Sequence, residues 1–173
     1  AVVGSLRGFS ADIAVRRGRG TDSVTVLDSV DLAVRAGCVT ALIGESGCGK
    51  SMVAAALAGL MPPGSRVRGT VRIGETDMDE HDEKGWRALR GRRIGFVPQS
   101  AATSFTPVRT VGSQLAEICT RLGADRNPEQ LCAAVALPAD VVDRYPGELS
   151  GGMAQRVAIA AALAGRPALL LAD

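Results

Sequence analysis

Apolar and polar positions alternate in part along residues 1–35, and this pattern predicts two strands. The expected strands are 4–15 and 24–35, and Ser23–Leu27 and Val30–Val34 have the β-branched, partly alternating composition of a half-exposed sheet. Between them, Arg16–Gly20 combines arginine with glycine and predicts a turn. The chain is therefore expected to begin with an antiparallel pair of strands.

A continuous apolar run follows at Cys38–Ile43 and is typical of a parallel strand that is buried on both faces. A glycine-rich turn comes next, and Ser51–Leu60 then contains good helix formers. Met61–Gly64, with two prolines and a glycine, predicts the end of this helix.

The rest of the chain continues the alternation of strands and helices. The expected strands are 69–74, 92–98 and 168–172, the expected solvated loop is 75–85, and the expected helical regions are 110–144, with breaks near Asn127–Pro128 and Pro138, and 150–165. This order predicts an α/β fold with parallel central strands, to which the antiparallel start and the helical block are additions.

Composition and charge narrow the classes of protein. The 173 residues are 46% hydrophobic and 22% charged, as in one globular domain. A net charge of +2 gives no reason to expect a nucleic-acid partner. No apolar run approaches the roughly 18 residues of a membrane span, and no secretory signal is expected. The four cysteines form no C-x-x-C pair, so the thiols suit a cytosolic protein and a zinc site is not expected.

The glycine-rich turn fits the phosphate-binding pattern G-x-x-x-x-G-K-[ST], for which chance predicts roughly 0.003 matches in a chain of this composition. Glycines let the backbone curl so that its N–H groups point at phosphate oxygens, and the helix that follows adds its dipole. The Lys50 ammonium would reach the β- and γ-phosphates, and the Ser51 hydroxyl would bind Mg²⁺. The predicted phosphate-binding residues are Gly44, Glu45, Ser46, Gly47, Cys48, Gly49, Lys50 and Ser51.

Asp173 ends the last apolar run, where a second carboxylate associated with Mg²⁺ would stand. Many strands end in aspartate, so the position carries weight only beside a phosphate-binding loop. With that loop present, Asp173 is predicted to be a Walker B aspartate.

A further set of motifs resembles the ABC-type ATPases. Residues 149–157 resemble the signature motif of that family, and Gln99 resembles its Q-loop glutamine. Ser150 and its glycines open a helix and offer donors to an anion. The resemblance implies that this anion is the γ-phosphate of ATP on a partner subunit, and that Gln99 joins Ser51 and Asp173 at Mg²⁺. The signature residues that it implies are Leu149, Ser150, Gly151, Gly152, Met153 and Gln155.

The resemblance covers nearly the whole chain. It implies a P-loop NTPase core of the ABC type with N-terminal antiparallel strands and an inserted helical subdomain, truncated at the Walker B aspartate so that the C-terminal part of the fold is missing. Within this single incomplete nucleotide-binding domain of 1–173, it assigns 1–98 to the β-rich and P-loop core, 99–155 to the Q-loop, helical subdomain and signature motif, and 156–173 to the signature helix and Walker B strand.

Within the family, three motifs resemble the forms found in the peptide/nickel importer group. These motifs are Gly44–Ser51, Thr103–Pro107 and Tyr145–Met153. This resemblance implies an ATP-binding subunit that drives uptake of a peptide or nickel-type solute. It also implies integral-membrane permease subunits, a second ABC ATPase subunit of the same or another kind and, indirectly, an extracytoplasmic solute-binding protein. The chain would lie in the cytoplasm on the inner face of the membrane. The permease contact would lie in 99–122, with Phe105 and Pro107 either lining a groove or, for Phe105, packing in the core.

The chain also departs from the family pattern. Arg17 stands near the usual place of an aromatic residue that stacks on adenine; its guanidinium could stack there, or it could be a solvated turn residue. Gly147 and Ala154 stand where the group usually has histidine and a basic residue. The general-base glutamate would follow Asp173, so no catalytic residue is present. We expect this chain alone to bind Mg-ATP and to hydrolyse it slowly, since loss of a general base typically removes about 10²–10⁴ in rate.

Two other readings stay open. The chain could be a nucleotide-binding module without a transport role, including a non-functional remnant. It could also be a soluble ABC-type ATPase of DNA repair or translation, although those usually carry coiled-coil insertions or two cassettes. A GTPase is disfavoured because Asn127 is the only asparagine and it is not part of an N-K-x-D motif.

Overall fold

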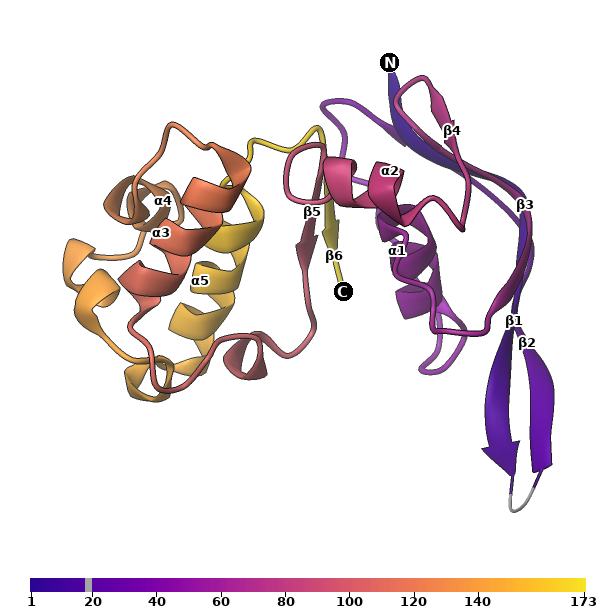
Figure 1. Ribbon diagram of the computed structural model, residues 1–173, viewed down its shortest axis with the longest axis horizontal. Helices are drawn as coiled ribbons and strands as arrows, with labels where there is room; N and C mark the ends of the chain where they lie inside the picture. Colours follow the sequence, from indigo (N-terminus) through magenta and orange to yellow (C-terminus); the bar gives the residue numbers. More distant parts are fainter. Residues whose placement is uncertain (18–19) are drawn as a thin grey trace. The chain divides into compact units, whose positions relative to one another are not determined.

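The structure is a computed structural model that describes residues 1–17 and 20–173, without the side chains of residues 16, 17, 20, 21 and 102. The chain folds into two compact units, Ala1–Ala88 and Leu89–Asp173. Each unit has a sheet and helices of its own (Figure 1), as expected of an α/β fold. The assignment of 1–98, 99–155 and 156–173 to separate parts of the nucleotide-binding domain stays a prediction.

Four antiparallel strands form the sheet of the first unit, in the order β2-β1-β3-β4. β1 (Val2–Arg17) pairs along its length with β2 (Gly20–Arg35), which confirms the predicted N-terminal strand pair. β3 (Arg66–Ile73) lies on the other side of β1, and the short β4 (Thr76–Met78) follows β3. Leu6, Phe9 and Ala11 of β1 are buried and give this sheet an apolar face.

Helix α1 (Lys50–Ala58) packs against strands β1, β2 and β3, and its last six residues are buried. It ends at Gly59, before the predicted stop at Met61–Gly64. Gly59 has a left-handed φ of 63°, and a Cβ there would lie 2.2 Å from the indole of Trp86. Trp86 belongs to α2 (Glu83–Leu89) and is 3% exposed. This apolar anchor explains why β4 and α2 form where an acidic solvated loop was expected.

The prediction of a buried strand at Cys38–Ile43 is wrong. The segment is irregular, and Val39 and Ile43 are 98% and 95% exposed. Of the two sheets that the described residues form, neither includes it. A parallel strand satisfies its backbone groups only through a neighbouring strand, and an apolar run cannot supply that neighbour by itself.

The second unit contains a parallel strand pair and three helices. β5 (Ile94–Val97) pairs with β6 (Leu169–Ala172), which confirms the strands expected at 92–98 and 168–172. Leu170 of β6 is 43% exposed, so the pair is buried on one face rather than on both. The helices are α3 (Val111–Leu122), α4 (Pro128–Ala134) and α5 (Gly151–Ala162), and the 3-10 turns are Ala101–Thr103, Ala139–Asp143 and Pro146–Glu148.

Capping side chains fix where these helices begin. Thr110, Asn127 and Ser150 each accept a hydrogen bond from a backbone N–H in the first turn of α3, α4 and α5. The three helices lie together in the second unit (Figure 1). They share one apolar core, which includes Leu115, Leu131, Val141 and Val157. Among the helices that the structure describes, none combines the length and the apolar composition needed to cross a membrane.

Candidate functional site

The glycine-rich loop 44–49 lies directly before α1 and is largely exposed. Gly49 has a φ of 93°, and a Cβ at this position would lie 2.7 Å from the Val26 carbonyl oxygen of β2. Backbone conformation and close approach therefore both require glycine where the loop enters the helix.

The ammonium group of Lys50 lies within the curve of this loop. Its Nζ donates to the carbonyl oxygens of Gly44 and Glu45 at 3.0 and 2.6 Å and lies 3.6 Å from Cys48 Sγ. A positive charge is thus held where the loop backbone turns around it. An anion that entered the loop would replace these contacts with neutral carbonyl oxygens by stronger contacts between opposite charges.

The N-terminus of α1 lacks the side-chain cap that α3, α4 and α5 have. Gly49 provides no side-chain cap, whereas α3, α4 and α5 are capped by threonine, asparagine and serine. The first N–H groups and the positive end of the helix dipole therefore face the loop without a competing capping oxygen from Gly49. Ser51 is the second residue of this helix and is exposed.

Gln99 and Asp173 lie at one edge of the parallel strand pair. Gln99 follows β5 and Asp173 follows β6, and Val97 pairs with Ala172 in register. The Asp173 N–H donates to the Val97 carbonyl oxygen at 3.1 Å and extends this pairing. Both residues are exposed. Their amide and carboxylate oxygens are of the hard-donor type that Mg²⁺ prefers, so these two side chains suit that ion.

Ser150 caps α5 at the start of the signature sequence. Its Oγ accepts from the Met153 N–H at 3.3 Å, and this contact leaves the hydroxyl proton available as a donor. A Cβ on Gly151 or Gly152 would meet nothing within 4 Å, so the first turn faces open space. Leu149 and Met153 pack instead against the apolar core and fix the helix start to the second unit.

The structure groups the predicted residues within each unit. Residues 44–51 form one cluster in the first unit, while Gln99, Asp173 and the signature residues 149–155 belong to the second. Gln155 is half-buried. The Arg17 side chain lies outside the described residues, and its role in adenine stacking stays a prediction.

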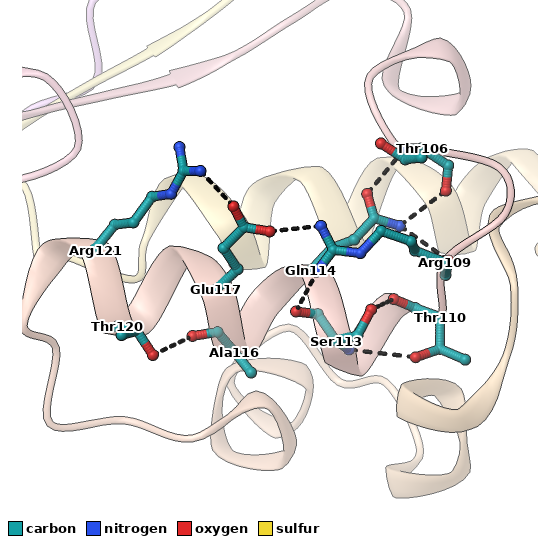
Figure 2. A network of polar contacts seen from close by, with 9 residues as sticks. All are labelled: Thr106, Arg109, Thr110, Ser113, Gln114, Ala116, Glu117, Thr120 and Arg121. Carbon is teal, nitrogen blue, oxygen red and sulfur yellow. Dashed lines mark hydrogen bonds and ion pairs between the residues drawn. The ribbon is translucent and has the colours of Figure 1, made fainter.

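Sequence reasoning missed a polar network on α3, drawn in Figure 2. Gln114 is 8% exposed, and its side chain bonds to the backbone of Thr106 and Arg109. Arg109 also forms an ion pair with Glu117, which in turn pairs with Arg121. One signal was available, because Gln114 stands three residues after the buried Val111 and therefore on the apolar face of α3.

Charge and burial shift the pKa of three groups in the second unit. The hydrogen bond from Arg109, together with the charges of Arg121 and Arg109, holds the pKa of Glu117 below its ordinary value. Burial raises the pKa of the Cys119 and Cys132 thiols, which disfavours their thiolates.

A glycine loop that curls around a lysine at a helix start defines a P-loop protein, and the serine-capped Gly-Gly helix marks the ATP-binding cassettes among them. The comparison with protein families agrees with this class. The family described as "ABC transporter" matches residues 27–173, and the chain belongs to that family.

Relatives in this family carry names that refer to peptide transport. The chain is 39% identical to the Mycobacterium tuberculosis "Oligopeptide transport ATP-binding protein OppD" over 171 residues, which cover 94% of this chain and 28% of the relative. It is also 39% identical to the Sinorhizobium fredii "Probable peptide ABC transporter ATP-binding protein y4tR", covering 89% of this chain and 49% of the relative. The chain thus spans half or less of the length of these relatives.

A solved structure supports the same fold. The "ATP-binding cassette MJ0796", described as dimeric, in a post-hydrolysis state and bound to ADP and Pi, aligns with a TM-score of 0.81 and 25% identity. The alignment covers 98% of this chain and 73% of that one. The fold is therefore that of an ABC ATPase cassette, of which this chain forms a part.

Proposed function

We propose that the chain binds Mg-ATP as the nucleotide-binding part of an ABC importer for a small solute, with peptides as the favoured cargo. The observation that carries the proposal is the exposed glycine loop with the Lys50 ammonium inside it and the uncapped end of α1 behind it. The names of the relatives support peptides rather than nickel.

The residues of the loop would bind the phosphates by exchange. The Lys50 Nζ would leave the Gly44 and Glu45 carbonyls and bind β- and γ-phosphate oxygens, while the loop N–H groups bind the others. The Ser51 hydroxyl would hold Mg²⁺ beside the phosphates, and Gln99 and Asp173 are proposed as further ligands of this ion. When bound, Mg²⁺ neutralises charge on the phosphates.

Ser150 would serve a nucleotide on a second ATPase subunit. Its hydroxyl proton is not used in the cap, and a Cβ at Gly151 or Gly152 would meet nothing within 4 Å, so a partner's γ-phosphate could approach the start of α5. Each chain would then supply half of two ATP sites, and ATP would join two subunits, of the same or of different kinds. The dimeric state of the MJ0796 cassette supports this arrangement.

Calorimetric titration with Mg-ATP tests the nucleotide site. The Lys50→Ala variant should bind at least about a hundredfold more weakly, since it loses charge-assisted hydrogen bonds to two phosphates. Lys84→Ala is the matched control, because Lys84 is the other lysine of the chain and is exposed on α2. Equal affinity in wild type and Lys50→Ala would refute the site.

Co-purification with the integral-membrane permease pair of an oligopeptide importer tests the transport role. Binding to that pair would place the chain in the cytoplasm on the inner face of the membrane, near a solute-binding protein only indirectly. ATP binding without permease binding would instead favour a nucleotide-binding module that has no transport role.

A further inference from the structure

The first unit contains a cavity of about 490 Å³ at the C-terminal end of α1. Strands β1, β3 and β4, helices α1 and α2 and the turn after α1 all contribute to its lining. Its volume falls within the range of small-molecule sites, which is about 300–1,000 Å³. The phosphate-binding residues 44–51 do not line it, so this cavity is separate from the proposed nucleotide site.

Apolar side chains form one part of the lining of this cavity. Phe9 and Trp86 line it and are otherwise buried, and Met61, Val67 and Met78 line it and are half-buried. Methionine side chains adapt their shape and make favourable contacts with aromatic rings. This part of the lining therefore suits the apolar body of a ligand, in particular an aromatic one.

The charged part of the lining is acidic. Among the described residues that line the cavity, the titratable ones are Asp79, Glu80 and His81, and none is lysine or arginine. The Asp79 carboxylate accepts from the His81 N–H at 2.9 Å, and Glu80 Oε1 lies 3.3 Å from His81 Nε2. Two carboxylates outweigh one imidazole in either of its protonation states. The lining therefore carries net negative charge beside an apolar surface.

Hydrogen bonds fix the two turns that line the cavity. The Asp79 carbonyl oxygen accepts from Trp86 Nε1 at 2.9 Å and from the Asp82 N–H at 3.1 Å. In the turn after α1, the Pro62 carbonyl oxygen accepts from the Ser65 N–H at 3.1 Å and from Ser65 Oγ at 2.6 Å. Because these turns are ordered without a ligand, binding would not cost the entropy of ordering them.

We infer that this cavity binds a small organic cation with an apolar body, as in an ammonium group attached to an aromatic ring. The apolar lining takes the body, and Asp79 and Glu80 attract the positive charge. An anion of the same shape is repelled by these carboxylates, and a neutral ligand gains nothing from them. An exposed pair of opposite charges strengthens binding by about twofold to fivefold. The inference goes beyond the proposed function, because it requires neither ATP nor a permease.

Three compounds with the same aromatic body and different charges test the inference. Phenethylamine is a cation, phenethyl alcohol is neutral and phenylacetate is an anion. The NMR signal of the Trp86 indole N–H reports binding, because Trp86 is the only tryptophan of the chain and lines the cavity. We expect a saturable shift with phenethylamine, an affinity at least about threefold lower for phenethyl alcohol, and weaker binding still for phenylacetate.

Substitutions then locate the site. Asp79→Asn keeps the acceptor for the His81 N–H, and Glu80→Gln keeps the shape of the side chain. Each should bind phenethylamine about twofold to fivefold more weakly and phenethyl alcohol as wild type does. Glu75→Gln is the matched control, because Glu75 is an exposed acid between β3 and β4 that does not line the cavity. Val67→Phe places a larger side chain in the cavity and should abolish binding of both compounds.

Several results would overturn the inference. They are no saturable shift with phenethylamine, equal affinity for the amine and the alcohol, and an effect of Glu75→Gln as large as that of Glu80→Gln. If Val67→Phe fails to fold, the ratio of the two affinities in Asp79→Asn and Glu80→Gln decides by itself. Mg-ATP affinity is measured in parallel. Its absence in the wild-type chain would refute the proposed nucleotide site and leave this inference standing, since the cavity shares no residue with 44–51.

Discussion

Glu117 shows how one half-buried side chain can be held by its neighbours. It pairs with Arg109 on one side and with Arg121, one helical turn further on, on the other. Since the carboxylate form is the one that these arginines bind, the pKa of Glu117 lies below its ordinary value. The same ion pairs hold Arg109 over α3, so the protonation state of Glu117 and the attachment of segment 106–109 are linked.

A pH titration checks this link. The folded-state pKa of Glu117 is lowered, so its ion pairs are complete above the unfolded-state pKa and are lost as pH falls through the folded-state value. Arg109→Met should raise the pKa of Glu117 towards that of an ordinary glutamate, as followed by NMR of the carboxyl carbon. Arg87→Met, which removes a pair with Glu83 on α2, should leave the pKa of Glu117 unchanged. No rise in Arg109→Met would contradict the assigned hydrogen bond.

At the scale of the element, two helices end on the same kind of residue in different surroundings. Gly59 ends α1 and Gly123 ends α3, with φ of 63° and 62°. A Cβ at Gly59 would strike the indole of Trp86, whereas a Cβ at Gly123 would meet nothing within 4 Å. Substitutions at Gly59 and Gly123 therefore allow the cost of backbone strain to be measured apart from the cost of a steric clash.

Alanine at each position should give different losses of stability. Gly123→Ala should lower the free energy of unfolding by about 1–2 kcal/mol, from left-handed strain alone. Gly59→Ala should cost about 1–3 kcal/mol more, because the indole must move. Chemical denaturation measures both losses, and the fluorescence of Trp86, the only tryptophan, should change in Gly59→Ala alone. Equal losses would mean that Trp86 does not pack on Gly59.

Local signals explain which elements the sequence could predict. Thr110, Asn127 and Ser150 are capping residues, and helices begin directly after them. The apolar run Cys38–Ile43 led to the wrong prediction of a strand, because a strand forms only beside neighbouring strands, which lie far away in sequence. Gln114 was missed for a related reason, since its partners are backbone atoms of a separate segment and no residue pattern identifies them.

The candidate site shows the same limit. Its residue types could be predicted from their spacing, whereas its arrangement could not. The parallel pairing of β5 with β6 sets Gln99 and Asp173 on one edge, and the loop carbonyls of Gly44 and Glu45 hold Lys50 in place. Neither arrangement follows from spacing in the sequence.

At the scale of the whole molecule, the start of α5 bears on assembly, because a Cβ at Gly151 or Gly152 would meet nothing within 4 Å. If Ser150 serves a nucleotide on a partner subunit, a bulky cation at this position should block association and spare nucleotide binding. Ser150→Arg should bind Mg-ATP as wild type does and remain monomeric when ATP is added, as measured by light scattering. Ser23→Arg, an equal change at an exposed position of β2, should still associate.

Weaker Mg-ATP binding in monomeric Ser150→Arg would show that Ser150 belongs to the site of its own chain. ATP-driven association that survives in this variant would also contradict the shared site. Either result would leave the proposed role of the phosphate-binding loop intact and contradict the proposed ATP site shared between two subunits.

The register of β5 and β6 has a consequence for how the protein folds. The two strands lie near opposite ends of the second unit in sequence, and the three helices lie between them. Contacts between such distant segments form slowly, because the chain must first lose the entropy of a long loop. Packing of the helices shortens that loop. The edge that carries Gln99 and Asp173 is therefore expected to assemble late, after the helical core has closed.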